Sequence, residues 1–213
     1  MTQEIINLDY KFTNLFPMTL HQLQIDEFEN KKRELVDFAY NLVRDKPHYQ
    51  RLVSNKNGGL QSEVYEVKGD NFLESLIFNI IKSVPVFNDK VTFKSFYWVN
   101  VNPPGAYNVK HCHPNSDVAG VLWLKAPKKS GDIVFISPND YTSFIELCSY
   151  TEEFRKQTYN YHSYRLPPKE GNVILFPSYL QHRVIENFSN DDRISVSFNI
   201  KITHEDYIAS GQN

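Results

Sequence analysis

The hydrophobic positions divide the chain into a helical first part and a strand-rich second part. Before residue 91, apolar side chains recur at intervals of three and four residues in two segments. The first segment carries Leu35, Phe38, Ala39, Leu42 and Val43, and the second carries Leu73, Leu76, Ile77, Ile80, Ile81 and Val84. This spacing is typical of amphipathic helices, so we expect two helices that each pack one face against a sheet.

Residues near the helix ends indicate where these elements begin and stop. Asp26 and, three positions later, Glu29 have the form of a capping box that opens the first helix. Pro47 cannot continue that helix, which should therefore end just before it. Residues 19–25 predict a strand ahead of the first helix, and the turn-rich residues 53–62 predict a loop between the two helices.

From residue 91 the helical spacing gives way to short runs rich in β-branched and aromatic residues. The runs are VTFKSFYWVNV, VAGVLWLKA, DIVFISP, NVILFPS, HRVIENF and RISVSFNIKI. Short strands separated by Gly, Pro, Asn or Asp predict an antiparallel sandwich or barrel. A polar, tyrosine-rich insertion at 139–165, with a helix-like segment at 143–148, interrupts the strands and is expected to form a lid or binding loop.

The pattern therefore predicts a mainly β fold with flanking helices. We expect one domain over residues 1–213, because this length suits a single core of medium size. Helical support and leading strands would occupy residues 1–90, and the β core would occupy residues 91–205.

The composition excludes several classes of protein. A net charge of -2, without a long basic or acidic block, gives no sign of binding to nucleic acid or to membrane surfaces. The two cysteines, Cys112 and Cys148, are too few for a disulfide scaffold. There is no basic leader followed by an apolar run, and no stretch of about 18 apolar residues. We therefore expect a cytoplasmic protein, with a homodimer left open as its assembly.

The strongest candidate chemistry lies at His111 and His113, just after a predicted strand. Side chains at i and i+2 of a strand point to the same face, with Cα atoms roughly 6.6 Å apart, so the two imidazoles can share one metal ion. Cys112 then points to the opposite face, where a small core residue is expected. His182 follows the strand at 171–178 and its turn, which places it at a barrel mouth as a third ligand.

Asp117 is the alternative to His113, because non-haem iron is usually held by two histidines and one carboxylate. On a continuing strand Asp117 would lie ~13 Å from His113, so it reaches the same ion only if residues 114–116 turn the chain back. We expect the set His111, His113 and His182 and keep Asp117 as a rival. Three neutral imidazoles would leave a charge of +2 on the ion, which favours an anionic chelating co-substrate.

Arg193 and Ser195 form a candidate anion site. Arg193 begins the apolar strand RISVSFNIKI, one hairpin after His182, and Ser195 shares its face of that strand. A buried arginine beside a hydroxyl can bind a carboxylate through two hydrogen bonds. The alternative is a surface arginine paired with Asp191 or Asp192.

Taken together, these motifs resemble those of the 2-oxoglutarate/Fe(II)-dependent dioxygenases. The order is His-x-His/Asp, a Gly-x-x-x-x-Phe-Pro strand, a second His and then Arg-x-Ser, over about residues 91–202. The similarity is closer to a group of uncharacterised bacterial and phage proteins and more distant to prolyl 4-hydroxylases. It implies a double-stranded β-helix (a jelly roll, cupin-like), with Fe(II) and 2-oxoglutarate as cofactors. It also implies hydroxylation of a substrate with release of succinate and CO2.

The resemblance assigns His111 and His182 as iron ligands. His113 stands where the family usually has an acidic ligand. In halogenating relatives Ala or Gly replaces that carboxylate and a halide takes its place. A histidine leaves no such vacancy, so the resemblance does not extend to halogenation.

The resemblance also implies how the co-substrate is held. Arg193 would bind the distal carboxylate of 2-oxoglutarate, with support from Ser195. Asn102 and Trp123 occupy places where relatives offer further hydrogen bonds to the co-substrate. Beyond the metal ligands, no separate catalytic residue is expected. The substrate would be a small molecule or a peptide, and no residue pattern chooses between them.

Two rival functions fit part of this pattern. A three-histidine metal dioxygenase of cupin type that does not use 2-oxoglutarate would explain His113, but it leaves Arg193 and Ser195 without a role. A jelly-roll binding module with a degenerate site would need neither metal nor co-substrate. The affinity for 2-oxoglutarate distinguishes the first rival, and the metal content distinguishes the second.

Overall fold

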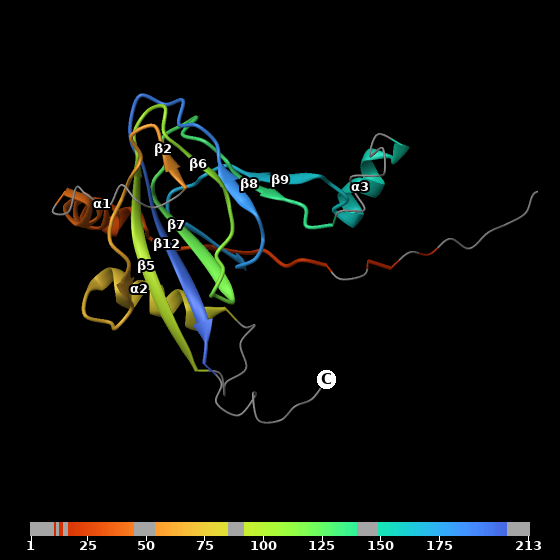
Figure 1. Cartoon of the computed structure of the whole chain (residues 1–213). Helices are drawn as coiled ribbons and strands as arrows, with labels where there is room; N and C mark the ends of the chain where they lie inside the picture. Colours follow the sequence, from red (N-terminus) through yellow and green to blue (C-terminus); the bar gives the residue numbers. More distant parts are fainter. Residues whose placement is uncertain are drawn as a thin grey trace, which may run out of the picture.

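The chain forms two antiparallel β-sheets with its two longer helices on one side (Figure 1). The computed structural model describes residues 11, 13–14, 17–44, 54–84, 92–139 and 149–203. The larger sheet, called the major sheet, contains in order β1 (His21–Gln24), β10 (Asn172–Pro177), β7 (Val118–Lys125), β12 (Arg193–Ile202), β5 (Phe93–Asn102) and β3 (Leu60–Gln61), with β4 (Tyr65–Glu66) also paired to β5. The minor sheet contains β2 (Asn55–Lys56), β6 (Tyr107–His111), β11 (His182–Val184), β8 (Ile133–Ile136) and β9 (Ser163–Leu166).

The path of the chain between the sheets is that of a jelly roll. From β5 to β8 each successive strand belongs to the other sheet, and the same alternation returns from β10 to β12. All described strand pairs are antiparallel. Double-sheet jelly rolls bury the inner faces of both sheets against each other. The mainly β class expected from the sequence is therefore confirmed.

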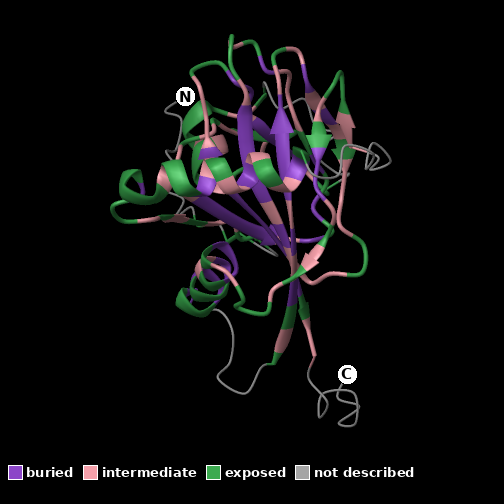
Figure 2. Cartoon of the chain, turned by 90° about the vertical axis from the view of Figure 1, so that its left-hand side faces the viewer, coloured by how far each residue is buried: buried purple, intermediate pink, exposed green. Residues whose placement is uncertain are grey.

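Two helices, α1 (Glu29–Arg44) and α2 (Phe72–Ser83), lie on the outer face of the major sheet (Figures 1 and 2). Their apolar stripes join one buried cluster with strand residues. From the helices the cluster includes Leu35, Ala39, Val43, Leu73, Ile77 and Ile81, and from the sheet it includes Tyr97, Val99, Leu122, Val196 and Phe198. The expectation that both helices pack against a sheet is confirmed.

The helix starts differ from the expected caps. Helix α1 begins at Glu29, and Glu27 has a positive φ of 50°, so residues 26–28 form a turn before the helix and Asp26 does not cap it. The capping-box prediction is wrong because a cap at Asp26 requires helical backbone at residue 27, where the chain is left-handed. The cap of α2 is Asn71, whose side chain accepts a hydrogen bond from the Glu74 N–H at 2.9 Å.

The predicted loops contain short strands. Strand β1 confirms the strand expected at 19–25, whereas the loop expected at 53–62 includes β2 and β3 on either side of a turn. The insertion at 139–165 includes β9 and helix α3 (Glu152–Thr158), which extends away from the side that carries α1 and α2 (Figure 1). The helix expected at 143–148 lies outside the described residues. No helix of the described chain is long and apolar enough to span a membrane.

Strands β5 and β12 separate an apolar outer face from a polar inner face. On β12 the helix-facing residues are Ile194, Val196, Phe198 and Ile200, and the inner residues include Arg193, Ser195 and Ser197. The two strands pair along their length, with Arg193 opposite Asn102 and Ser195 opposite Asn100. Because side chains alternate between the two faces of a strand, the polar residues point into the space between the sheets when the apolar ones pack against the helices.

Candidate functional site

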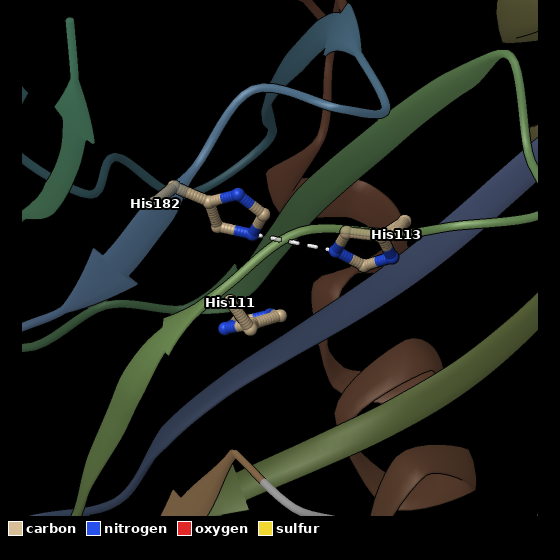
Figure 3. A group of neighbouring side chains, drawn as sticks. All are labelled: His111, His113 and His182. Atoms are coloured by element: carbon tan, nitrogen blue, oxygen red, sulfur yellow. Dashed lines mark hydrogen bonds between the residues drawn. The ribbon is translucent and has the colours of Figure 1, made fainter. Parts of the chain in front are cut away.

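Three histidines meet between the sheets (Figure 3). One ring nitrogen from each of His111, His113 and His182 lies within 4.8 Å of the others. The Nε2 atoms of His113 and His182 are 3.3 Å apart. Three imidazole nitrogens at this separation can coordinate one divalent metal ion.

The strand register brings these side chains together. His111 is the last residue of β6 and pairs directly with His182, the first residue of β11. His113 lies two residues beyond the end of β6, where its backbone N–H donates to the Ser178 carbonyl at 2.8 Å. The proximity of His111 and His113 is as expected, but it comes from a strand end and a turn, not from one continuous strand.

Cys112 does not occupy the core position expected for it. Its side chain is half-buried, and the residue contributes to the lining of the cavity that holds the three histidines. The expected core position required β6 to continue through residue 112, and β6 ends at His111.

Backbone carbonyls orient two of the three imidazoles. The Nδ1–H of His111 donates to the Val109 carbonyl at 2.7 Å, and the Nδ1–H of His182 donates to the Leu180 carbonyl at 2.9 Å. These bonds fix the tautomer that leaves the Nε2 lone pair free, which is how metal-binding histidines are usually held. The two rings are therefore set for coordination without any rearrangement of the backbone.

The three imidazoles are neutral at pH 7. Burial lowers the pKa of His111. Burial and the nearby His111 lower the pKa of His113 to about 4. Burial, His111 and His113 lower the pKa of His182 to about 3. Each imidazole therefore offers a nitrogen lone pair to a metal ion, and binding of the ion does not require an imidazolium to lose a proton first.

Asp117 lies outside this cluster. Its Oδ2 accepts from the Ile202 N–H at 2.8 Å and its Oδ1 from Lys201 Nζ at 3.2 Å, so its carboxylate is bound to the end of β12. Residues 114–116 do turn, with Asn115 at a φ of 75°, but this turn does not bring the carboxylate to the histidines. The geometry favours His113 over Asp117 as the third ligand.

Aromatic side chains surround the histidines. Trp98 stacks on His113 with ring centroids 5.6 Å apart. Phe176 meets His182 edge to face at 4.8 Å, and Phe135 packs against Phe176 at 4.9 Å. Such apolar neighbours lower the local dielectric constant and strengthen electrostatic interactions within the site.

The histidines open onto a cavity of about 280 Å³ between the two sheets. Its polar lining residues are Ser54, Gln61, Asn100, Asn108, His111, Cys112, His113, His182, Arg193, Ser195 and Ser197. No Asp or Glu is among the described residues that line it. Arg193 and Ser195, proposed from the sequence as an anion site, share this cavity with the histidines.

Arg193 is a buried cation, with 2 % of its surface exposed. Its guanidinium donates to the carbonyls of Ser130 and, at 3.3 Å, Ile185, and to Asn108 Oδ1 at 3.4 Å. Burial lowers its pKa to about 10, so it remains charged at neutral pH. No carboxylate in the described chain forms an ion pair with it, as the salt bridges found there all involve other residues.

The surface pairing considered for Arg193 is not what the structure shows. Asp191 instead pairs with Lys125 Nζ at 2.7 Å, and Asp192 accepts from the Tyr40 hydroxyl at 2.8 Å. A buried charge without a partner is costly. Because Arg193 opens onto the cavity, a bound carboxylate is the partner that its environment lacks.

An amide network extends from Arg193 through Asn108 to Asn55, and of its members only Asn102 was predicted from the sequence to have a role. Asn55 Oδ1 accepts from Asn108 Nδ2 at 2.5 Å and from Asn102 Nδ2 at 3.1 Å, while its Nδ2 donates to Asn100 Oδ1 at 3.0 Å. Asn102, proposed to bind co-substrate, is buried in this network and is not among the cavity-lining residues. Trp123 does line the cavity. Polar and apolar residues alternate at the end of β5, and this alternation could have identified Asn100 as a residue of the inner face.

Comparison with known proteins points to one superfamily. A family model described as "Putative 2OG-Fe(II) oxygenase" matches residues 96–199. A search of curated protein sequences finds no match. A prolyl-4-hydroxylase of Pseudomonas putida has a TM-score of 0.57 at 13% identity, over 85% of this chain and 91% of that one.

Two further solved structures are similar to the chain. A prolyl hydroxylase of Trichoplax adhaerens, in complex with a hypoxia inducible factor peptide fragment, has a TM-score of 0.58 at 12% identity, over 91% of this chain and 87% of that one. The non-haem alpha-ketoglutarate-dependent carbocyclase SnoK of nogalamycin biosynthesis has 0.57 at 11%, over 92% and 87%. These likenesses show the fold, and the expected jelly roll is confirmed.

Proposed function

Because the chain belongs to the 2-oxoglutarate/Fe(II)-dependent oxygenase superfamily, we propose that it hydroxylates a C–H bond of its substrate with release of succinate and CO2. The enzyme is an oxidoreductase whose cofactors are Fe(II) and 2-oxoglutarate. In the overall balance, one O2 supplies one oxygen atom to the substrate and one to succinate, while 2-oxoglutarate loses CO2. The substrate is a small molecule or a peptide.

His111, His113 and His182 would hold the iron, which when bound supplies the oxygen activation that side chains cannot perform. Their Nε2 atoms converge, and two of the rings are fixed by backbone carbonyls. Trp98 stacks on His113 and Phe176 meets His182 edge to face, and these contacts hold the two rings in place.

Arg193 would bind the distal carboxylate of 2-oxoglutarate, and Ser195 would donate a further hydrogen bond. The single observation that carries this proposal is a buried arginine without an ion-pair partner in the described chain, opening onto the cavity that the three histidines share. A three-histidine dioxygenase that does not use 2-oxoglutarate would have no need of such a cation.

Turnover of 2-oxoglutarate tests the proposed reaction. Purified protein with Fe(II), O2 and 2-oxoglutarate should form succinate slowly even without its substrate, and His182→Ala should abolish this. Succinate is measured directly, with Fe(II) omitted as the blank. Failure of both iron and 2-oxoglutarate to bind under anaerobic conditions would exclude the reaction.

The arginine can be tested separately through binding. Arg193→Gln should weaken 2-oxoglutarate binding by about 30-fold or more, since losing one partner of a buried charge pair costs roughly 2–5 kcal/mol. Ser195→Ala should weaken it only about fivefold, as expected for one hydrogen bond. Titration calorimetry on the Mn(II)-loaded protein measures both values.

Arg183→Gln is the matched control, because Arg183 is exposed on β11 and does not line the cavity. It should bind 2-oxoglutarate as the unmodified protein does. Arg193→Lys keeps the charge and guards against loss of folding. An unchanged affinity in folded Arg193→Gln would assign the distal carboxylate to another residue.

A further inference from the structure

We propose that His113 makes tight metal binding conditional on a dianionic chelator, so that the metal ion and 2-oxoglutarate bind cooperatively. The inference rests on the proposed function, because it assumes that the three histidines hold the ion. It concerns the consequence of having an imidazole at the position where the family usually has an acidic ligand.

The charges around the cavity are the first reason. No carboxylate lies among the described residues that line it, and a histidine that coordinates a metal ion does so through a neutral imidazole. Arg193 already places one positive charge in this space. A divalent ion bound alone would add two more, without any anion from the described lining.

The surroundings cannot relieve this charge. The partners of Arg193 are backbone carbonyls and the Asn108 amide. The carboxylate of Asp117 is held by Ile202 and Lys201. Trp98 and Phe176 pack apolar rings against the histidines. In such surroundings the repulsion between the ion and the guanidinium is weakly screened.

A chelating dicarboxylate would offset most of this positive charge. Its two negative charges offset two of the three positive ones, with one end on the ion and the distal carboxylate on Arg193. Since coupling between two ligands is reciprocal, 2-oxoglutarate must raise metal affinity by the same factor by which the metal raises 2-oxoglutarate affinity.

His113 determines the size of this effect. An aspartate there would neutralise one charge of the ion before any co-substrate arrives. The His113 Nε2 atom is 3.3 Å from His182 Nε2, so an ion held by His182 would lie beside residue 113. Aspartate is smaller than histidine, which allows His113→Asp to fit without overpacking.

The test measures Mn(II) affinity from the electron paramagnetic resonance signal of the free ion. For the unmodified protein, saturating 2-oxoglutarate should tighten Mn(II) binding by about 30-fold or more, within the usual range of coupling. In His113→Asp, Mn(II) alone should bind at least about tenfold tighter than to the unmodified protein, and the effect of 2-oxoglutarate should fall by about tenfold. His113→Glu is the second variant in case His113→Asp does not fold.

Two analogues separate the contributions of the ligand. Pyruvate can chelate but lacks the distal carboxylate, and succinate has two carboxylates but no keto group. Each should give a smaller coupling than 2-oxoglutarate. Equal coupling with pyruvate would overturn the part of the inference that involves Arg193.

The outcomes distinguish this inference from the proposed function. If 2-oxoglutarate binds the Mn(II)-loaded protein but its coupling is the same in His113→Asp, the role of His113 is overturned while the proposed function stands. If neither Mn(II) nor 2-oxoglutarate binds in any combination, the proposed function fails and this inference fails with it.

Discussion

Burial lowers the pKa of all three clustered histidines, and this affects stability as well as metal binding. In an unfolded chain each imidazole has a pKa of about 6.5. In the folded protein the pKa of His113 is about 4 and that of His182 about 3, because burial and the neighbouring imidazoles oppose protonation. The folded state therefore binds fewer protons than the unfolded state between these values.

Stability of the metal-free protein should consequently fall as the pH falls. Because the unfolded state binds more protons below pH 6.5, the free energy of unfolding decreases from there down to the folded pKa values. Each histidine contributes at most about 1.4 kcal/mol per pH unit. Urea unfolding at pH 7 and pH 5 measures this, within a window above the titration of most carboxylates. His182→Asn should reduce the pH dependence, and an unchanged dependence would contradict the assignment.

The site residues show what sequence reasoning can find. Strand periodicity and hairpin spacing predicted that His111, His182, Arg193 and Ser195 lie on inner faces, and the structure places all four at one cavity. The position of Cys112 at the cavity was not predicted, because it depends on the end of β6 at His111. Beyond that end, the His113 N–H bonds to the Ser178 carbonyl, which lies outside the strand pairs of β6.

At the scale of elements, the packing of β7 against β12 depends on a glycine. A Cβ added to Gly120 would lie 2.3 Å from Cζ of Phe198, and Phe198 is fully buried beneath the helices. The contact leaves no room for an alanine unless the ring moves. The two central strands of the major sheet can therefore approach with a phenylalanine between sheet and helices only because residue 120 lacks a side chain.

Gly120→Ala should destabilise the protein by about 1–3 kcal/mol, the usual cost of overpacking a core. For a chain of this length, that lowers the melting temperature by roughly 2–4 °C per kcal/mol. Gly120→Ala combined with Phe198→Leu should lose less than the sum of the two single variants, because the smaller side chain makes room for the new methyl group. Additive losses in urea unfolding would show that the two residues do not interact.

Elements long enough to show a period were predictable, and the shortest ones were not. The stripes of α1 and α2 and the runs of β5, β7 and β12 each repeat often enough to be read. Strands β2 and β3 have two residues each, so they show no period. Asn55, the centre of the amide network, and Gln61, which lines the cavity, lie on these strands, and for that reason their positions could not be foreseen.

At the scale of the whole molecule, the site joins the two sheets. The minor sheet supplies His111 and His182, whereas the major sheet supplies Arg193 and Ser195. A metal ion held by the first pair and a dicarboxylate held by the second would connect the sheets through the cavity. Ligand binding should therefore stabilise the jelly roll as a unit.

Thermal unfolding tests whether the ligands stabilise the folded chain. A ligand at about 100 times its dissociation constant stabilises the folded state by about 2.7 kcal/mol, which for a chain of this length raises the melting temperature by roughly 5–10 °C. Mn(II) and 2-oxoglutarate together should reach this shift, measured by differential scanning calorimetry, and 2-oxoglutarate alone should give much less. Arg193→Gln should lose the increment due to 2-oxoglutarate and Arg183→Gln should keep it. Binding shown by calorimetry without any thermal shift would mean that the unfolded chain binds the ligands as well, which would contradict a site built by the folded sheets.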